Sequence, residues 1–209
     1  MAERAASGGG KWVDVPPERL TRWLENFATR HGAYTEEGLT LIAADGASAS
    51  WEIPPGAPKV DTMADLILQA RTPRRLGLLL ARKGAVAVGV AEGPELVKSK
   101  VERNYVQGRT AAGGWSQQRF ARRRDNQAKA AASDGADIVG RILLPEVRDL
   151  AALITGGDRS AVDAILGVPS LAPVAGLRAD RLLDVPEPRH AVLVSAVAGA
   201  RAVSVLVKN

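Results

Sequence analysis

The chain has 209 residues, 46% of them hydrophobic and 4% aromatic, a size that allows one medium domain with a real core and a smaller region beside it. It contains no cysteine and only two histidines, His31 and His190, which excludes disulfides and thiolate metal sites and argues against a zinc site or a Cys–His nucleophile. The formal net charge is +5, but residues 98–131 hold nine Lys and Arg against two Asp and Glu, so the rest of the chain sums to −2. Positive charge concentrated in one segment is typical of a protein that binds a polyanion.

The sequence has no pattern of a membrane segment. Residues 1–10 are small and polar and lack the apolar stretch of a secretion signal. The most apolar run, over 191–207, is interrupted by Arg201 and is short for a bilayer span. We therefore expect a soluble, cytoplasmic protein with no membrane partner.

The first part of the chain is predicted to be a small α/β region over 11–58, after a disordered tail over 1–10. In chain order the patterns predict an amphipathic helix over 16–30 and two strands over 38–44 and 49–53, joined by the turn Asp45-Gly46. The helix begins at Pro16-Pro17, and its apolar residues recur at helical spacing: Leu20, Trp23, Leu24 and Phe27. A proline-rich stretch over 54–58 marks the boundary.

The second part, residues 59–209, alternates strands and helices. In chain order we predict a helix over 63–70, a β-hairpin over 76–82 and 85–91 around Lys83-Gly84, a basic strand over 98–107, a helix over 117–137, a strand over 141–144, a short helix over 146–150, a strand over 152–155, a helix over 159–166, a segment over 181–185 and a helix–strand pair over 190–207. This order indicates an α/β (α+β) fold in which helices cover both faces of a mixed sheet.

A glycine- and glutamine-rich loop over 108–118 separates the basic strand from the basic helix. Gly113 and Gly114 permit close approach of a ligand backbone. Ser116 is a good N-cap, which would place Gln117 in the first helical turn, beside unpaired backbone N–H groups that favour an anion. A glutamine is neither acid nor base at neutral pH, but its amide can place a water molecule or stabilise an oxyanion.

Positive side chains continue along the helix that follows the loop. Arg119, Arg122 and Arg123 share one helical face, which Asn126 and Lys129 extend. A solvated basic helix without chemistry explains this pattern as well as a phosphate-binding surface does. The same two interpretations apply to the cations of the preceding strand and loop, which are Lys98, Lys100, Arg103 and Arg109.

The run Gly-Gly-Trp-Ser-Gln-Gln-Arg-Phe-Ala-Arg over 113–122 resembles the active loop of archaeal and eukaryotic class-1 release factors. There the run is Gly-Gly-Gln-Ser, two residues, then Arg-Phe-Ala-Arg. The closest resemblance is to the actinobacterial-type branch of the Vms-like release factor (VLRF) family and covers residues 74–207. Trp115 occupies the position of the release-factor glutamine, so we take Gln117 as the first functional candidate and Gln118 as the second.

The resemblance implies an RNase H-like catalytic domain and hydrolysis of peptidyl-tRNA on the large ribosomal subunit, in ribosome rescue or quality control. Gln117 would orient water against the ester, and Trp115 would either stack on a base or anchor the loop. Contacts to rRNA or tRNA phosphates would come from Arg109, Arg119, Arg122, Arg123, Arg124 and Lys129. No metal or cofactor is implied, and we expect a monomer.

Two alternatives remain open. A tRNA endonuclease of the two-metal kind needs clustered carboxylates, whereas Asp134 and Asp137 share one helix end and Asp45, Asp61 and Asp65 are scattered. The other is a non-catalytic ribosome-binding adaptor, which would not need the glycine pair and the adjacent glutamines.

Overall fold

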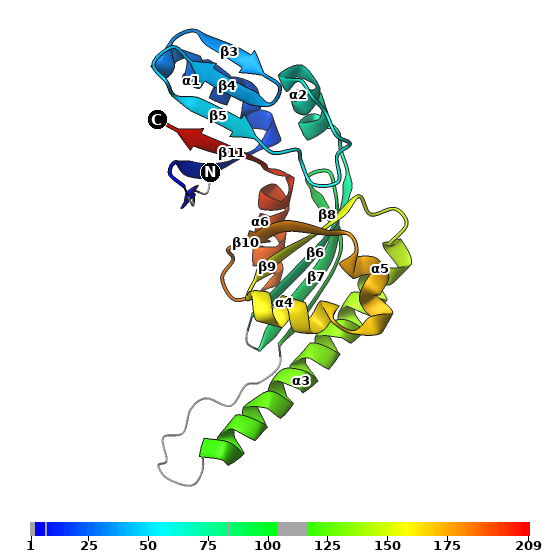
Figure 1. Cartoon of the computed structure of the whole chain (residues 1–209). Coiled ribbons are helices and arrows are strands. Elements are labelled where there is room, and N and C mark those ends of the chain that lie inside the picture. The colour runs from blue at the N-terminus through cyan, green and yellow to red at the C-terminus, as the bar shows by residue number, and fades with distance from the viewer. Residues whose placement is uncertain (1–2, 7, 83, 104–116) are drawn as a thin grey trace. The chain divides into compact units, whose positions relative to one another are not determined.

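The computed structural model of the chain describes residues 3–6, 8–82, 84–103 and 117–209, with side chains from residue 130 onward in the last range. The chain divides into two compact units, Met1–Arg74 with Ala198–Asn209, and Arg75–Val197. Figure 1 labels the elements of both. None of the helices in the described ranges combines the length and the apolar character needed to cross a membrane.

The first unit is an antiparallel sheet with two helices. Its strand order is β1-β2-β11-β5-β4-β3. The strands are β1 (Glu3–Ala5), β2 (Lys11–Val15), β3 (Tyr34–Glu37), β4 (Thr40–Ala43), β5 (Ser48–Trp51) and β11 (Val203–Lys208), and the helices are α1 (Leu20–His31), after a 3₁₀ turn over Pro17–Arg19, and α2 (Met63–Arg71).

Aromatic packing holds α1 to the sheet. The Trp23 ring of α1 stacks on Phe27 at 5.6 Å and meets Trp51 of β5 edge-on at 4.8 Å. The helix ends at Gly32, whose φ of 81° is in the region that favours glycine. The helix α2 begins at Thr62, whose hydroxyl accepts a hydrogen bond of 3.1 Å from the Asp65 amide.

The helix predicted over 16–30 and the strands predicted over 38–44 and 49–53 are confirmed by α1, β4 and β5. Other parts of this unit differ from expectation. Residues 3–5, expected in a disordered tail, form β1 and pair with β2, across which Lys11 and Glu3 make an ion pair of 3.2 Å.

The division between the units also differs from the expected boundary at 58. Strand β11 comes from the C-terminal end of the chain, yet it pairs with β2 on one side and β5 on the other. Its alternating valines, Val203, Val205 and Val207, enter the core of the first unit. Helix α2, expected in the second part, packs into the same core through Met63 and Leu66. A local sequence pattern does not show which distant segments pair or pack together, and this explains both differences.

The second unit is a mixed five-stranded sheet of order β10-β9-β6-β7-β8. Strands β6, β7 and β8 form an antiparallel meander, and β9 and β10 lie parallel to β6 and to each other. The elements are β6 (Arg75–Arg82), β7 (Ala85–Glu92), β8 (Glu95–Arg103), α3 (Gln117–Ile142), β9 (Ala152–Gly157), α4 (Arg159–Leu166), α5 (Ala172–Ala175), β10 (Arg178–Leu183) and α6 (His190–Arg201), with 3₁₀ turns at Leu144–Glu146 and Pro169–Leu171.

Helices cover both faces of this sheet. On one face, Ile138 of α3 and Ile165 of α4 share a core with Val88 of β7. On the other face, α6 approaches β7 so closely that a Cβ at Gly89 would lie 3.1 Å from Leu193 Cδ2. The predicted α/β fold with a mixed sheet and helices on both faces is confirmed.

The hairpin around residues 83–84, the strand over 152–155 and the helix over 159–166 are confirmed. The third strand is β8 and ends at Arg103, and residues 104–107 lie outside the described ranges. The strand predicted over 141–144 is wrong, because α3 continues to Ile142 and a 3₁₀ turn follows. The apolar run there is too short to distinguish strand from helix, and Pro145 ends the helical segment. The predicted helix over 146–150 is replaced by that turn and further turns.

Candidate functional site

The site predicted from the sequence lies where β8 ends and α3 begins. Gly113, Gly114, Trp115 and Arg109 fall between these two elements, outside the residues that the structure describes. The other predicted residues lie on the backbone of α3, before its described side chains begin: Gln117, Gln118, Arg119, Arg122, Arg123, Arg124 and Lys129. Helix α3 begins at Gln117 as predicted, and the roles of these residues stay predictions.

Helix α3 carries the predicted site on a long helical segment. Its 26 residues extend over about 39 Å at a rise of 1.5 Å per residue. Among its described side chains, those that enter or pack on the core are Ala132, Ala136, Ile138, Val139 and Ile142. The N-terminal half continues beyond the end of the sheet (Figure 1).

A glycine in α3 sets how closely this helix approaches the rest of the unit. A Cβ at Gly135 would lie 2.7 Å from Ile165 Cδ1 and 2.9 Å from Ile165 Cγ1, and 3.4 Å from Val86 Cγ2. Contacts under 3.0 Å between carbon atoms are repulsive, so only glycine allows α3 to approach α4 and β7 this closely.

A buried carboxylate joins the C-terminal end of α3 to the sheet. Glu146, 8% exposed, follows α3 in the 3₁₀ turn. Its Oε2 accepts hydrogen bonds from Arg75 Nη2 at 2.7 Å and Nε at 3.1 Å, and its Oε1 accepts one from Lys98 Nζ. Arg75 also pairs with Glu92 at 3.0 Å. Glu146 therefore connects the end of α3 to β6 and to β8.

These cations stabilise the ionised form of Glu146. The hydrogen bond from Lys98, followed by those from Arg75, holds the pKa of the Glu146 carboxyl below its ordinary value. The carboxylate is therefore charged at neutral pH. Sequence reasoning missed Glu146, because no local signal links residues 75, 98 and 146.

The cations of β8 differ in whether they have an ion-pair partner. The sequence left open whether Lys98 contacts a phosphate or only solvent, and in the structure its ammonium group is paired with Glu146 instead. Lys100 and Arg103 are exposed, and neither has an ion-pair partner among the residues that the structure describes. Lys100 lies opposite Val88 and Arg103 opposite Ala85, toward the end of the strand that leads to residue 104.

Acidic side chains are present but dispersed. Arg82 lies between Asp158 and Asp184, at 3.8 Å and 3.7 Å. Asp134 and Asp137 are exposed on α3. Within the described ranges no three His, Asp or Glu side chains gather as metal ligands would. A ring nitrogen of His31, Nδ1, lies 2.8 Å from a carboxylate oxygen of Asp45.

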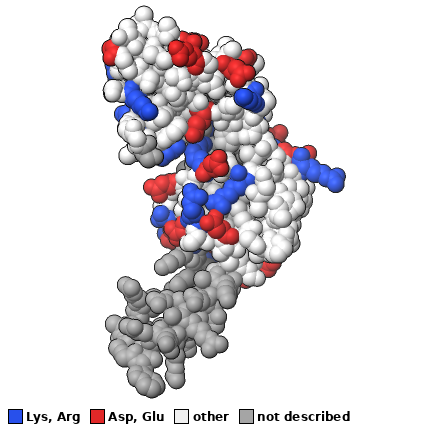
Figure 2. Space-filling model, viewed as in Figure 1, with Lys and Arg blue, Asp and Glu red and all other residues white. Residues whose placement is uncertain are grey.

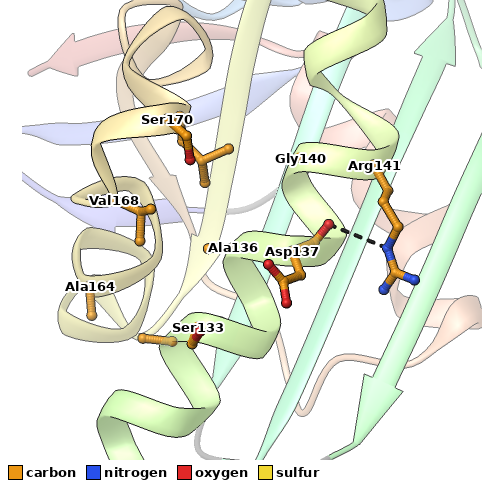
Figure 3. A pocket seen from close by; sticks show the side chains of 10 residues that line it. Ser133, Ala136, Asp137, Gly140, Arg141, Ala164, Val168 and Ser170 are labelled. Carbon is orange, nitrogen blue, oxygen red and sulfur yellow. Dashed lines mark hydrogen bonds between the residues drawn. The ribbon is translucent and has the colours of Figure 1, made fainter.

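A shallow groove lies along the C-terminal half of α3. It measures about 520 Å³ and runs between α3 and the segment from α4 to the following 3₁₀ turn (Figure 3). Its polar residues, Ser133, Asp137, Arg141 and Ser170, are exposed to solvent. Arg141 Nε donates to the Asp137 carbonyl at 3.4 Å.

In the view of Figure 2 the described surface has no patch of only basic or only acidic side chains, because the two kinds are intermingled. This agrees with the sequence, in which the positive excess belongs to residues 98–131 and the remainder sums to −2.

The comparison with protein families agrees with the resemblance of the loop sequence. The model of the acVLRF1 family, described as Actinobacteria/chloroflexi VLRF1 release factor, matches residues 74–206. No curated protein matches the chain.

Among solved structures, the crystal structure of the archaeal translation termination factor aRF1 is similar, with 14% identity and a TM-score of 0.42 over 90% of this chain and 63% of that one. A second structure, described as an archaeal protein, has 13% identity and a TM-score of 0.41, over 91% and 66%. The chain thus spans just under two thirds of the length of each.

Proposed function

Because the chain belongs to the Actinobacteria/chloroflexi VLRF1 release factor family, its role is related to that of release factors, and we propose that it hydrolyses peptidyl-tRNA on the large ribosomal subunit. The observation that carries this proposal is the run of residues 113–122, which lies inside the matched range and joins a glycine pair to glutamines at the start of α3.

The reaction needs a water molecule placed against the ester between the peptide and the 3′ ribose of the tRNA. The side-chain carbonyl of Gln117 accepts a hydrogen bond from that water, and its amide N–H can donate to the oxygen on which negative charge develops. The backbone N–H groups in the first turn of α3 add a positive dipole near the same charge. Water supplies the hydroxyl of the released peptide acid and the proton of the ribose 3′-hydroxyl.

Binding to the ribosome is proposed to depend on phosphate contacts. These come from Arg109 and from the basic residues of α3, Arg119, Arg122, Arg123, Arg124 and Lys129, so affinity falls steeply as salt is added. The protein acts in the cytoplasm as a monomer, without metal or cofactor, and serves rescue or quality control of stalled ribosomes.

The test is release of labelled peptide from peptidyl-tRNA on purified large ribosomal subunits with a stalled nascent chain. We expect wild-type protein to release the peptide, Gln117→Ala to lose release while still sedimenting with the subunits, and Gln118→Ala to be affected less. Gln127→Ala is the matched control, because the same residue type is removed from the same helix ten positions away.

Other outcomes decide against the proposal. Wild-type binding without release would favour the adaptor. A shortened tRNA, in place of an intact deacylated one, would identify an endonuclease. Equal loss in the Gln117 and Gln127 variants would show that the glutamine acts through the helix and not on water.

A further inference from the structure

Gln117 and Gln118, the predicted catalytic glutamines, lie at the N-terminal end of a long helix. Gln117 is 19 positions before Ala136, a buried residue of α3, and this corresponds to about 28 Å along the helix axis. A rotation of α3 by about 5° around Ala136 therefore moves Gln117 by about 2.5 Å. Small errors in the direction of α3 become large displacements at the site.

Two features of the described residues set that direction. One is the packing of α3 on α4 and β7, which is closest at Gly135 and continues along the helix through Ile138 and Val139. The other is Glu146, which lies beyond the other end of the packed segment and is bonded to Arg75 of β6 and Lys98 of β8. The contacts of Glu146 lie beyond this packed segment, so they extend the length over which α3 is held against the sheet.

Glu146 is bonded through Lys98 to β8, the strand that precedes the loop, and it lies four residues after the end of α3, the helix that follows the loop. Strand β8 leads to residue 104 and α3 begins at residue 117. Lys98 holds β8 to the turn that follows α3. Lys98 lies opposite Val90 and Arg75 lies opposite Glu92, whereas Arg103, which leads to residue 104, lies opposite Ala85 at the other end of β7. The ion pair of Lys98 and Glu146 is therefore at the end of the sheet away from Arg103.

We propose that Glu146 is a positioning residue, which fixes α3 against β8 and thereby holds Gln117 in place. The catalytic consequence rests on the proposed hydrolase function, but the structural part does not. Since a misplacement of about 1 Å at a reacting centre can cost about 100-fold in rate, loss of the Glu146 contacts should lower the rate of release at saturation and leave ribosome affinity nearly unchanged.

The first measurement is a distance that needs no activity. The chain has no cysteine, so spin labels can be attached at Ala121→Cys on α3 and at Ala191→Cys, an exposed position on α6. We expect Glu146→Gln to shift or broaden the distance distribution. Lys98→Met should have a smaller effect of the same kind. It removes only the contact of Glu146 with β8, made by a half-exposed side chain, and leaves Arg75 bonded to Glu146.

The matched control is Asp163→Asn. It removes the 2.6 Å ion pair between Asp163 of α4 and Arg178 of β10. Among the residues that the structure describes, this pair is bonded neither to β8 nor to the end of α3. The control should keep the wild-type distribution. An unchanged distribution in both Glu146→Gln and Lys98→Met overturns the proposal.

The second measurement is peptide release as a function of ribosome concentration. We expect Glu146→Gln to lower the saturating rate about tenfold or more, with an unchanged half-saturating concentration, while Asp163→Asn keeps both. If wild-type protein releases no peptide, the proposed function fails and the distance measurement alone decides this inference. A displaced helix in a variant that releases peptide at the wild-type rate refutes the positioning role.

Discussion

Two glycines of α3 offer a direct test of how closely this helix is packed. Both lie in the described half of the helix, five residues apart. A Cβ at Gly135 would meet Ile165 at 2.7 Å and 2.9 Å, whereas a Cβ at Gly140 would find Leu144 Cδ1 at 3.8 Å and Leu171 Cδ2 at 4.0 Å, which is ordinary contact. Substitution by alanine should therefore have opposite effects at the two positions.

The magnitudes follow from two effects. Replacing glycine by alanine inside a helix stabilises it by up to about 1 kcal/mol, and Gly140→Ala should raise the free energy of unfolding by this amount. At Gly135 the same gain is opposed by overpacking of about 1–3 kcal/mol, because Ile165 is 2% exposed and has little room to move. The helix propensity is common to both variants, so their difference in free energy of unfolding is about 1–3 kcal/mol.

Unfolding has to be followed in the second unit. The four tryptophans are Trp12, Trp23 and Trp51 in the first unit and Trp115 outside the described residues, so their fluorescence does not report the packing of α3. Amide hydrogen exchange on α4 and β7 reports the free energy of opening directly. A difference of 1 kcal/mol corresponds to about 2–4 °C in Tm for a chain of this size.

A double substitution separates the contact from other causes. Ile165→Val removes the Cδ1 atom that lies nearest to the new methyl group. Alone it should cost about 0.5–1.5 kcal/mol, but together with Gly135→Ala it should cost less than the sum of the two. Equal effects of alanine at Gly135 and Gly140, or strict additivity with Ile165→Val, would refute the close packing of α3 on α4.

Three further predictions concern charge. Glu146→Gln should make stability less dependent on pH in the acid range, because Lys98 and Arg75 hold the folded pKa of Glu146 below its ordinary 4.5. The stabilisation is complete above pH 4.5 and is lost as the pH falls through the folded pKa. The Tm difference between wild type and variant in circular dichroism melts should therefore shrink at acid pH, and a constant difference would show that the ion pair is unimportant. Lys98→Gln should lower the Tm, whereas Lys100→Gln should change stability by less than about 0.5 kcal/mol and weaken sedimentation with large ribosomal subunits; the reverse order would contradict the assignment of Lys98 to Glu146. Arg122→Gln should lower the slope of log affinity against log salt by about 0.7–0.9, and an unchanged slope would exclude a phosphate contact at that position.

Much of the second unit could be predicted because its elements have strong local patterns. The hairpin around residues 83–84 has a turn between two apolar runs, and α4 was predicted with its observed bounds, 159–166. The family was recognisable from the loop sequence alone, and the family comparison confirms it over residues 74–206. A local pattern is sufficient wherever neighbouring residues determine the conformation.

Only the tertiary structure could reveal interactions between distant residues. Glu146 is separated from Lys98 by 48 positions and from Arg75 by 71, and Ser204 of β11 bonds to Asp14 of β2 across 190. The sequence by itself determined the helices and strands with a strong local pattern, such as α4 and the β6–β7 hairpin, and which family the loop resembles, since periodicity and short motifs are local. Which strands are neighbours, and which charged residues are ion-paired, was decided by the packing of the whole chain, because that energy depends on residues that no local pattern connects.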